Sequence, residues 1–238
     1  MSELDRIRAE YARRALDPRL QDRYSLFRPD VLFTLHGRER AIVRLLQQAG
    51  FEPLEHFEIL ELGCGAGGVL LELLRLGADP DRLYGCDLLP ERVTEARHRL
   101  PTGVDLAVAD GGALPYPSTR FDLVLQFTVF TSVLDEGLRQ RIAVEMWRVL
   151  RPGGAVLWYD FRFQSRNNPA VRAIHPRQVR ALFPHGTFTA RRVTMAPPIA
   201  RRLARWSWLA CEMLALLPWL RTHDLILIQR DREATHGG

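Results

Sequence analysis

The chain has 238 residues, 47% of them hydrophobic, and a formal net charge of +5, which suits one large domain or one domain with a small appendage. All 33 basic residues are arginine, so no step can depend on a lysine base or a lysine Schiff base. The arginines are interleaved with acids, which disfavours a nucleic-acid partner, and the three cysteines are too widely spaced for a disulfide framework or a metal pair. We therefore expect a cytoplasmic protein without a metal site.

The first 50 residues predict a helical cap. Residues 2–16 have a charged helical pattern, residues 17–29 form an irregular link, and residues 30–50 predict an amphipathic helix that ends at Gly50. The N-terminal sequence MSELDRIRAE lacks the apolar centre of a signal peptide. We expect residues 11–36, with Tyr11, Tyr24 and His36, to cover the active site.

From residue 51 to the end we expect one α/β domain. Strands are predicted at 57–62, 82–87, 104–109, 121–126 and 154–161, with helices between them at about 67–76, 91–99 and 135–150. Short apolar strands that alternate with helices form parallel sheets, and right-handed crossovers place helices on both faces. The pattern therefore predicts a doubly wound, mostly parallel sheet.

The last third of the chain changes in style. It predicts a helix at 176–183, a strand at 187–195, a helix at 199–217 and a final strand at 224–230, with a break at Pro197-Pro198. The apolar run from Trp206 to Leu220 is shorter than the roughly 20 residues of a transmembrane helix. We interpret 199–220 as a helical insertion that serves first as a lid or internal packing, second as a dimer contact and third as a peripheral membrane contact. The chain is accordingly expected to be a monomer or a homodimer.

The most informative motif is ILELGCGAGG at 59–68, where a strand runs into a glycine-rich turn and then a helix. Gly63, Gly65 and Gly67 allow a sharp turn and a close approach of the backbone to a ligand. The helix that follows offers free N–H groups and the positive end of its dipole. Glu61 stands near the end of the strand, where a carboxylate can meet an ammonium group.

Two further acids end the next two predicted strands. Asp87 in YGCDLLPERV is placed to accept hydrogen bonds from a ribose diol, and Asp110 in VADGGALPYP from the amine of an adenine. Three acids on three consecutive strand ends match one ligand that carries an amino group, a ribose and an adenine.

This set of motifs resembles the class I S-adenosylmethionine-dependent methyltransferases, and more narrowly the ubiquinone/menaquinone-biosynthesis (type 11) group. The resemblance covers residues 57–162 and includes FDLVLQ at 121–126 and RVLRPGG at 148–154. It implies S-adenosyl-L-methionine as the cofactor. It also implies a Rossmann-like sheet of seven strands with an antiparallel last strand, for which 187–195 and 224–230 supply the closing hairpin.

The same resemblance assigns the cofactor contacts. Glu61 and Gly63 would face its methionine end, Asp87 the ribose, and Asp110 and Gly111 the adenine. Gln126 and Phe127 would line the methionine side after the fourth strand. The rest of the assigned set is Cys64, Gly65, Gly67 and Leu88, although the Cys64 side chain, like that of Cys86, is expected to pack rather than react.

Two alternatives stay open at this point. Residues 63–68 also satisfy G-x-G-x-x-G, so an NAD(P)-dependent oxidoreductase of Rossmann type is a rival. It explains Glu61 and Asp110 less well, and a short-chain dehydrogenase would need a lysine. A non-catalytic module with a methyltransferase fold is the other alternative.

The acceptor is harder to predict. Methyl transfer is an in-line displacement, and a hydroxyl acceptor must also lose a proton. The candidate bases are Asp160 and Tyr159 at the end of the fifth strand, and His175; His36 is a further possibility. The chain lacks D-P-P-Y, N-P-P-Y and Pro-Cys motifs, which disfavours DNA bases. Its aromatic residues Phe127, Phe130, Trp158, Tyr159, Phe161 and Phe163 favour a small molecule, and we lean to O-methylation of a sugar or natural-product hydroxyl.

Overall fold

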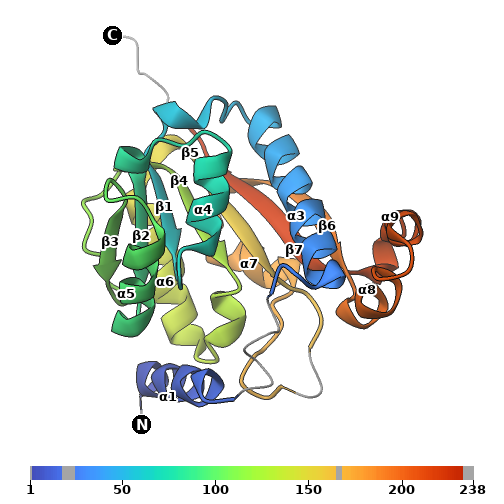
Figure 1. Ribbon diagram of the computed structural model, residues 1–238. Helices are drawn as coiled ribbons and strands as arrows, with labels where there is room; N and C mark the ends of the chain where they lie inside the picture. The colour runs from blue at the N-terminus through green and yellow to red at the C-terminus, as the bar shows by residue number, and fades with distance from the viewer. Residues whose placement is uncertain (1, 18–24, 165–167, 233–238) are drawn as a thin grey trace.

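The computed structural model describes residues 2–17, 25–164 and 168–232. Its centre is one sheet in the strand order β3-β2-β1-β4-β5-β7-β6 (Figure 1). The strands are β1 (Ile59–Leu62), β2 (Leu83–Asp87), β3 (Asp105–Val108), β4 (Phe121–Phe127), β5 (Leu150–Phe161), β6 (Gly186–Met195) and β7 (Arg221–Arg230). Strand β7 runs antiparallel to both of its neighbours, and the other paired strands are parallel. This confirms the predicted fold class.

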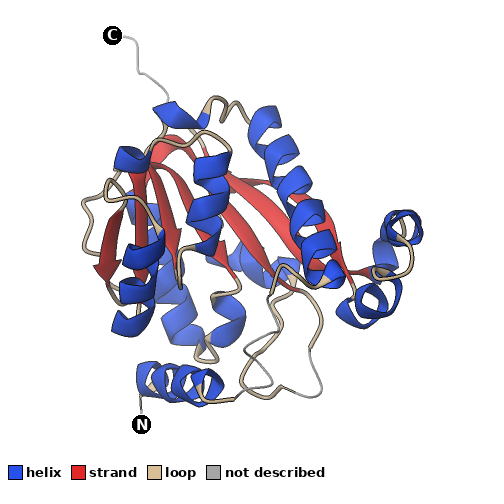
Figure 2. Cartoon of the chain, in the orientation of Figure 1, coloured by secondary structure: helices blue, strands red, loops and turns tan. Residues whose placement is uncertain are grey.

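Helices cover both faces of the sheet (Figure 2). They are α1 (Glu3–Ala15), α3 (Pro29–Gln48), α4 (Gly68–Arg75), α5 (Pro90–Arg99), α6 (Glu136–Val149), α7 (Pro176–Leu182), α8 (Pro197–Leu203) and α9 (Trp208–Ala215). Because side chains alternate along a strand, Leu60 and Leu62 join the core under α6, while Ile59 joins the core under α3, α4 and α5. Among the described helices, none is long and apolar enough to span a membrane.

The two helices of the first 50 residues lie in different places. Helix α1 crosses below the carboxyl ends of the strands, whereas α3 lies alongside β7 and β6 (Figure 1). Ile42, Leu45 and Leu46 of α3 are buried in the main core. The division into a cap of residues 1–50 and a domain of residues 51–238 therefore stays a prediction.

The region after β6 differs from the single helix predicted at 199–217. It consists of α8 and α9, followed by a short 3-10 turn at Pro218–Leu220. The side chain of Ser207 accepts a hydrogen bond from the N–H of Ala210 at 3.1 Å and so begins a new helix. Pro197 and Pro198 start α8 rather than break the chain, because proline fits the first turn of a helix, where the N–H groups have no helical partner.

Candidate cofactor site and active site

A cavity of about 330 Å³ lies at the carboxyl ends of β1, β2 and β4, where strand order reverses and ligands of α/β sheets bind. One wall is made by the glycine-rich turn and the residues that follow β2 and β3. The other is made by α1 and the turn after β4. The lining residues are Leu4, Ile7, Tyr11, Leu62, Gly63, Gly65, Cys86, Asp87, Leu88, Leu89, Arg92, Ala109, Asp110, Gly111, Phe127, Thr128, Val129, Ser132, Val133, Leu138 and Ile142.

The glycine-rich turn has a backbone that only glycine adopts without strain. Gly63, Gly65 and Gly67 have φ angles of +69°, +52° and +75°. The N–H of Gly63 donates to the carbonyl of Cys86 at 2.7 Å, which ties the turn to β2. A Cβ at Gly63 would clash with the side chain of Val129, while one at Gly65 would meet no atom within 4 Å. The chain therefore presents open backbone to the cavity at Gly65.

Both strand-end acids are held by backbone donors. The Asp87 carboxylate accepts from the N–H of Gly65 at 2.9 Å and from that of Leu89 at 3.0 Å. Asp110 accepts from the N–H of Gly112 at 2.8 Å. Each carboxylate keeps lone pairs for a ligand, since two oxygens offer about four acceptor positions. Burial raises the pKa of Asp87, and hydrogen bonds donated by a ligand would stabilise its charged form.

Glu61 lies on the other face of β1 from Leu62 and does not line the cavity. It is buried near Arg38 and Glu72, which pair with one another across α3 and α4. Burial and the Glu72 charge raise the pKa of Glu61 well above its usual range. One of its carboxylate oxygens has no hydrogen-bond partner within the described part of the chain. This oxygen is buried outside the cavity lining, so the expected contact of Glu61 with an ammonium group stays a prediction.

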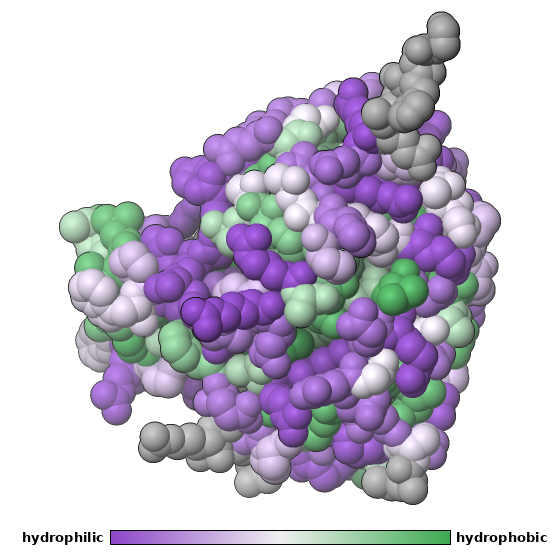
Figure 3. Space-filling view, turned by 180° about the vertical axis from the view of Figure 1, so that it is seen from behind, coloured by the Kyte–Doolittle hydropathy of each residue, from purple (hydrophilic) through white to green (hydrophobic). Residues whose placement is uncertain are grey.

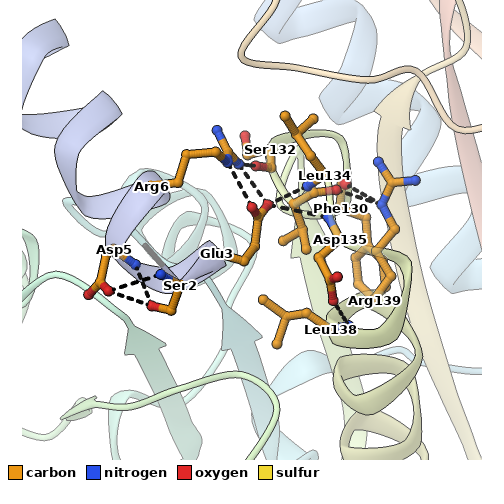
Figure 4. A network of polar contacts seen from close by, with 11 residues as sticks. Ser2, Glu3, Asp5, Arg6, Phe130, Ser132, Leu134, Asp135, Leu138 and Arg139 are labelled. Carbon is orange, nitrogen blue, oxygen red and sulfur yellow. Dashed lines mark hydrogen bonds and ion pairs between the residues drawn. The ribbon is translucent and has the colours of Figure 1, made fainter.

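Helix α1 is fastened to the turn after β4 by a network of polar contacts (Figure 4). Glu3 accepts hydrogen bonds from the N–H groups of Leu134 at 2.5 Å and Asp135 at 3.4 Å. Arg6 pairs with Glu3 at 2.8 Å and donates to the carbonyl of Ser132 at 2.6 Å. This contact with Arg6 lowers the pKa of Glu3, which keeps the network charged at neutral pH. It holds Leu4, Ile7 and Tyr11 over the cavity.

The turn after β4 is itself strained. Thr128 lines the cavity and has a φ of +59°, a conformation that is a genuine outlier for a β-branched residue. Its N–H donates to the carbonyl of Tyr159 at 2.8 Å, and Gln126 accepts from the N–H of Val129 at 3.1 Å. Such strain persists only where the surrounding structure enforces it, and it concentrates at functional sites.

The three predicted catalytic residues lie away from the cavity walls. Asp160 is buried under the turn, where it accepts from the hydroxyl of Thr131 at 2.6 Å, and burial raises its pKa to about 7. Tyr159 is buried on the α3 face, stacked on His223 with ring centroids 4.7 Å apart. His175 is exposed and caps α7. Their catalytic assignment stays a prediction.

The other acceptor-side predictions divide in the same way. Of the six aromatic residues expected near the acceptor, Phe127 alone is in the cavity lining. Phe130 and Trp158 pack in the core with their ring centroids 4.3 Å apart. His36 is outside the cavity lining, and its ring centroid lies 6.1 Å from that of Trp208 in α9. Tyr24 lies outside the described residues.

The structure brings most of the assigned cofactor residues together. Those in the cavity lining are Gly63, Gly65, Asp87, Leu88, Asp110, Gly111 and Phe127. Those behind it are Glu61, Cys64, Gly67 and Gln126, which shape or support the turns; Cys64 packs in the core, where burial raises the pKa of its thiol. The cavity also includes Arg92, Val129 and Ile142, which sequence reasoning missed because nothing in their local pattern separates them from ordinary helix and turn residues.

Comparison with known proteins identifies the central part of the chain. Residues 59–154 match a family described as a methyltransferase domain. A structure of an S-adenosylmethionine-dependent methyltransferase from Methanosarcina mazei has the same fold, with a TM-score of 0.54, 20% identity, and coverage of 74% of this chain and 93% of that one. The architecture is therefore that of the class I methyltransferases, and S-adenosylmethionine is the cofactor of that class. This outcome confirms the resemblance and disfavours the nicotinamide alternative.

The relatives differ in what they methylate. A ubiquinone biosynthesis O-methyltransferase from Azorhizobium caulinodans is 36% identical over 44% of this chain and 40% of its own length. Ajmaline N-methyltransferase from Rauvolfia serpentina is 22% identical over 84% of this chain and 70% of its own length. A tRNA N(3)-methylcytidine methyltransferase from Drosophila melanogaster is 28% identical over 45% of this chain, which spans 35% of that protein.

Proposed function

We propose that this chain, whose residues 59–154 are a methyltransferase domain of the class I fold, is an enzyme that transfers a methyl group from S-adenosylmethionine to a small molecule. The observation that carries the proposal is the cavity. The glycine-rich turn and two oriented acids form one wall, and an apolar cover formed by α1 closes the other. The cytoplasmic setting expected from the sequence is part of the same proposal.

The residues of this chain supply binding and alignment. When bound, S-adenosylmethionine offers an electrophilic methyl group on its sulfonium, and the acceptor must attack in line with the departing sulfur. Asp87 would accept hydrogen bonds from the ribose diol, Asp110 would orient the adenine amine, and Gly65 would let the backbone approach the ligand closely.

The acceptor side favours a small, largely apolar molecule that carries a hydroxyl group. Leu4, Ile7, Val129 and Val133 form an apolar cover, and the hydroxyl groups there belong to Tyr11, Thr128 and Ser132. A few polar groups within an apolar lining are typical of small-molecule sites. A natural-product hydroxyl fits this lining. A small-molecule acceptor also agrees with two of the relatives, the ubiquinone biosynthesis O-methyltransferase and ajmaline N-methyltransferase. A cover that excludes water from the reaction would strengthen electrostatic interactions inside the cavity.

We assign separate roles to Tyr11 and Asp160. Tyr11 projects from α1 into the cavity and would hydrogen-bond to the acceptor hydroxyl. Asp160 is a positioning residue, because its bonds to Thr131 hold the turn that carries Thr128 and Val129. It acts on the acceptor only through that turn.

The test uses the full chain with S-adenosylmethionine labelled in its methyl group. One reaction contains a metabolite extract, a second contains total tRNA, and a third contains neither. Label in an extractable small molecule supports the proposal, and label in tRNA overturns the acceptor class. Cofactor binding without transfer in any reaction would favour the non-catalytic module. Tyr11→Phe should raise the KM for the acceptor more than it lowers kcat.

A further inference from the structure

The segment after β6 carries an exposed apolar surface that the methyl-transfer site does not use. Helices α8 and α9 project from the body of the molecule (Figure 1). Helix α9 is apolar on both faces: Cys211 and Leu214 face a small core with Phe33 and Met195. The opposite face has no such cover. A helix that is apolar all round normally has both faces buried.

We call that opposite face, with its neighbours, the apolar tip; it consists of Trp206, Leu209, Met213, Leu216 and Trp219. Trp206 is 81% exposed, Leu209 72% and Trp219 69%. Leu209, Met213 and Leu216 follow the spacing that places residues on one side of a helix. Figure 3 shows the protrusion as a largely hydrophobic lobe beside hydrophilic surface. Contiguous exposed apolar surface of this kind marks an interaction site.

A second feature adjoins the apolar tip. A groove of about 400 Å³, here called the arginine groove, is lined by Arg28, Pro29, Asp30, Arg201, Arg202 and Arg205. Asp30 is engaged by Arg28 at 3.1 Å, and within the described ranges neither Arg202 nor Arg205 forms an ion pair. The groove thus joins four guanidinium groups to one carboxylate, and it is suited to phosphate.

The two features are continuous along the chain. Trp206 follows Arg205 directly, and Phe27, which is 99% exposed, directly precedes Arg28. Two segments far apart in sequence therefore each bring an exposed aromatic residue beside the same group of arginines. Aromatic rings next to basic side chains suit the interface of a membrane, where rings enter the headgroup layer and the cations bind lipid phosphate.

We propose that the apolar tip and the arginine groove form a docking surface for a bilayer that contains anionic phospholipid. A second copy of the chain fits less well, because a twofold contact through the same surface would set the arginine grooves against one another. Strand β6 is parallel to β5, since both are antiparallel to β7. Helix α8 therefore leaves the edge strand β6 at the same end of the sheet that holds the cavity, whose lining lies farther along the sheet at β1, β2 and β4. The proposal does not depend on the methyl acceptor.

The experiment is co-sedimentation of the full chain with two kinds of vesicle, phosphatidylcholine alone and phosphatidylcholine with about one-third phosphatidylglycerol. Three variants are compared: W206S/L209S/W219S, R201Q/R202Q/R205Q, and the control R44Q/R141Q/R177Q, which removes exposed arginines elsewhere. Each near-surface arginine contributes about fivefold to binding of an anionic surface, so the groove variant should bind at least about tenfold more weakly. The control should bind like the unchanged chain, and salt should weaken binding.

The outcomes separate the possible occupants. Binding to the anionic vesicles alone, lost in the first two variants and kept in the control, supports the proposal. Absence of vesicle binding overturns it, as does equal loss in the control variant. Sedimentation equilibrium without lipid is measured in parallel. A dimer that W206S/L209S/W219S converts to a monomer, with no binding of vesicles, would assign the surface to a second copy instead. Thermal unfolding of each variant identifies any that fails to fold.

Discussion

The two walls of the cavity are built in different ways. One wall, here called the cofactor wall because it is proposed to bind the cofactor, comes from residues 62–65, 87–89 and 110–111 at the ends of strands. Its hydrogen bonds are local or join neighbouring strands. The cover wall joins α1 to the turn after β4, and the hydrogen bond from Arg6 to Ser132 spans 126 residues of sequence. A wall that is fixed by local backbone geometry can be predicted from a sequence motif. A wall that is fixed by contacts between distant segments cannot.

The largest expected effect is on the pH dependence of stability. It tests whether Asp160, which lies beneath the cover wall, acts by holding the turn in place rather than as a catalytic base. Burial raises its pKa from the usual value of 3.8 to about 7, so the folded state holds a proton that the unfolded state releases. The stability this confers is present below about pH 4 and is lost as the pH rises through about 7. Between pH 5 and pH 8 the free energy of unfolding should fall by about 2–3 kcal/mol from this group.

Urea unfolding across that range checks the prediction. Asp160→Asn should make the slope shallower by this amount, and the exposed Asp105→Asn should leave it unchanged. A folded Asp160→Asn variant that loses methyl transfer at every pH, while its stability keeps the original pH slope, would return Asp160 to the role of a base.

The next effect concerns the cofactor wall. Asp87→Ala removes the proposed acceptor for the ribose diol, and a lost hydrogen bond to a charged group costs about 1.5–3 kcal/mol. Affinity for S-adenosylhomocysteine should fall by about 10- to 100-fold in isothermal titration calorimetry. Asp105→Ala is the matched control, since Asp105 stands at the opposite end of the neighbouring strand β3. Equal affinity in both variants would refute the assignment of Asp87.

Much of the cofactor wall could be predicted because its residues are required by local geometry. The positive φ angles at Gly63, Gly65 and Gly67 demand glycine, and acids at strand ends stand out in an apolar pattern. Glu61 shows the limit of this reasoning. The motif placed it correctly at a strand end, but the side of the sheet it faces follows from the pleat, which directs it toward Arg38 and away from the cavity wall.

The cover could not be predicted to the same depth. Residues 11–36 were expected over the site, yet Leu4, Ile7 and Tyr11 of α1 line the cavity and His36 packs near Trp208. Which face of a charged helix meets the body depends on contacts such as Glu3 with Leu134, which join residues 131 positions apart. The break within 199–217 could not be predicted for a different reason, because Ser207 begins a new helix in a run that contains no glycine or proline to mark the boundary.

Two glycines, one in the cavity lining and one outside it, allow the effect of backbone strain on stability to be separated from its effect on ligand binding. Gly65 and Gly77 both have positive φ, and a Cβ at either would meet no atom within 4 Å. Replacing either glycine with alanine should lower the free energy of unfolding by a similar amount, about 1–2 kcal/mol, because a Cβ is unfavourable in the left-handed conformation. Only Gly65→Ala should also weaken S-adenosylhomocysteine binding, by roughly tenfold, since Gly65 alone of the two lines the cavity. Thermal unfolding and calorimetry on both variants separate the two effects.

The smallest expected effect concerns the cover wall. Arg6→Gln removes the pair with Glu3 and the bond to Ser132, whereas the exposed Arg8→Gln on the same helix leaves both in place. The first variant should raise the KM for the acceptor several-fold, with cofactor affinity nearly unchanged, and the second should behave like the unchanged chain. Steady-state kinetics at saturating cofactor checks this, and identical KM values in the two variants would remove α1 from the acceptor site.

The most direct test of the account is a calorimetric titration of the full chain with S-adenosylhomocysteine and, separately, with NAD. The geometry of Gly65, Asp87 and Asp110 predicts one site for S-adenosylhomocysteine with a Kd in the micromolar range, and no heat of binding for NAD. Binding of NAD without binding of S-adenosylhomocysteine would contradict the assignment of the cavity and the methyl transfer that depends on it.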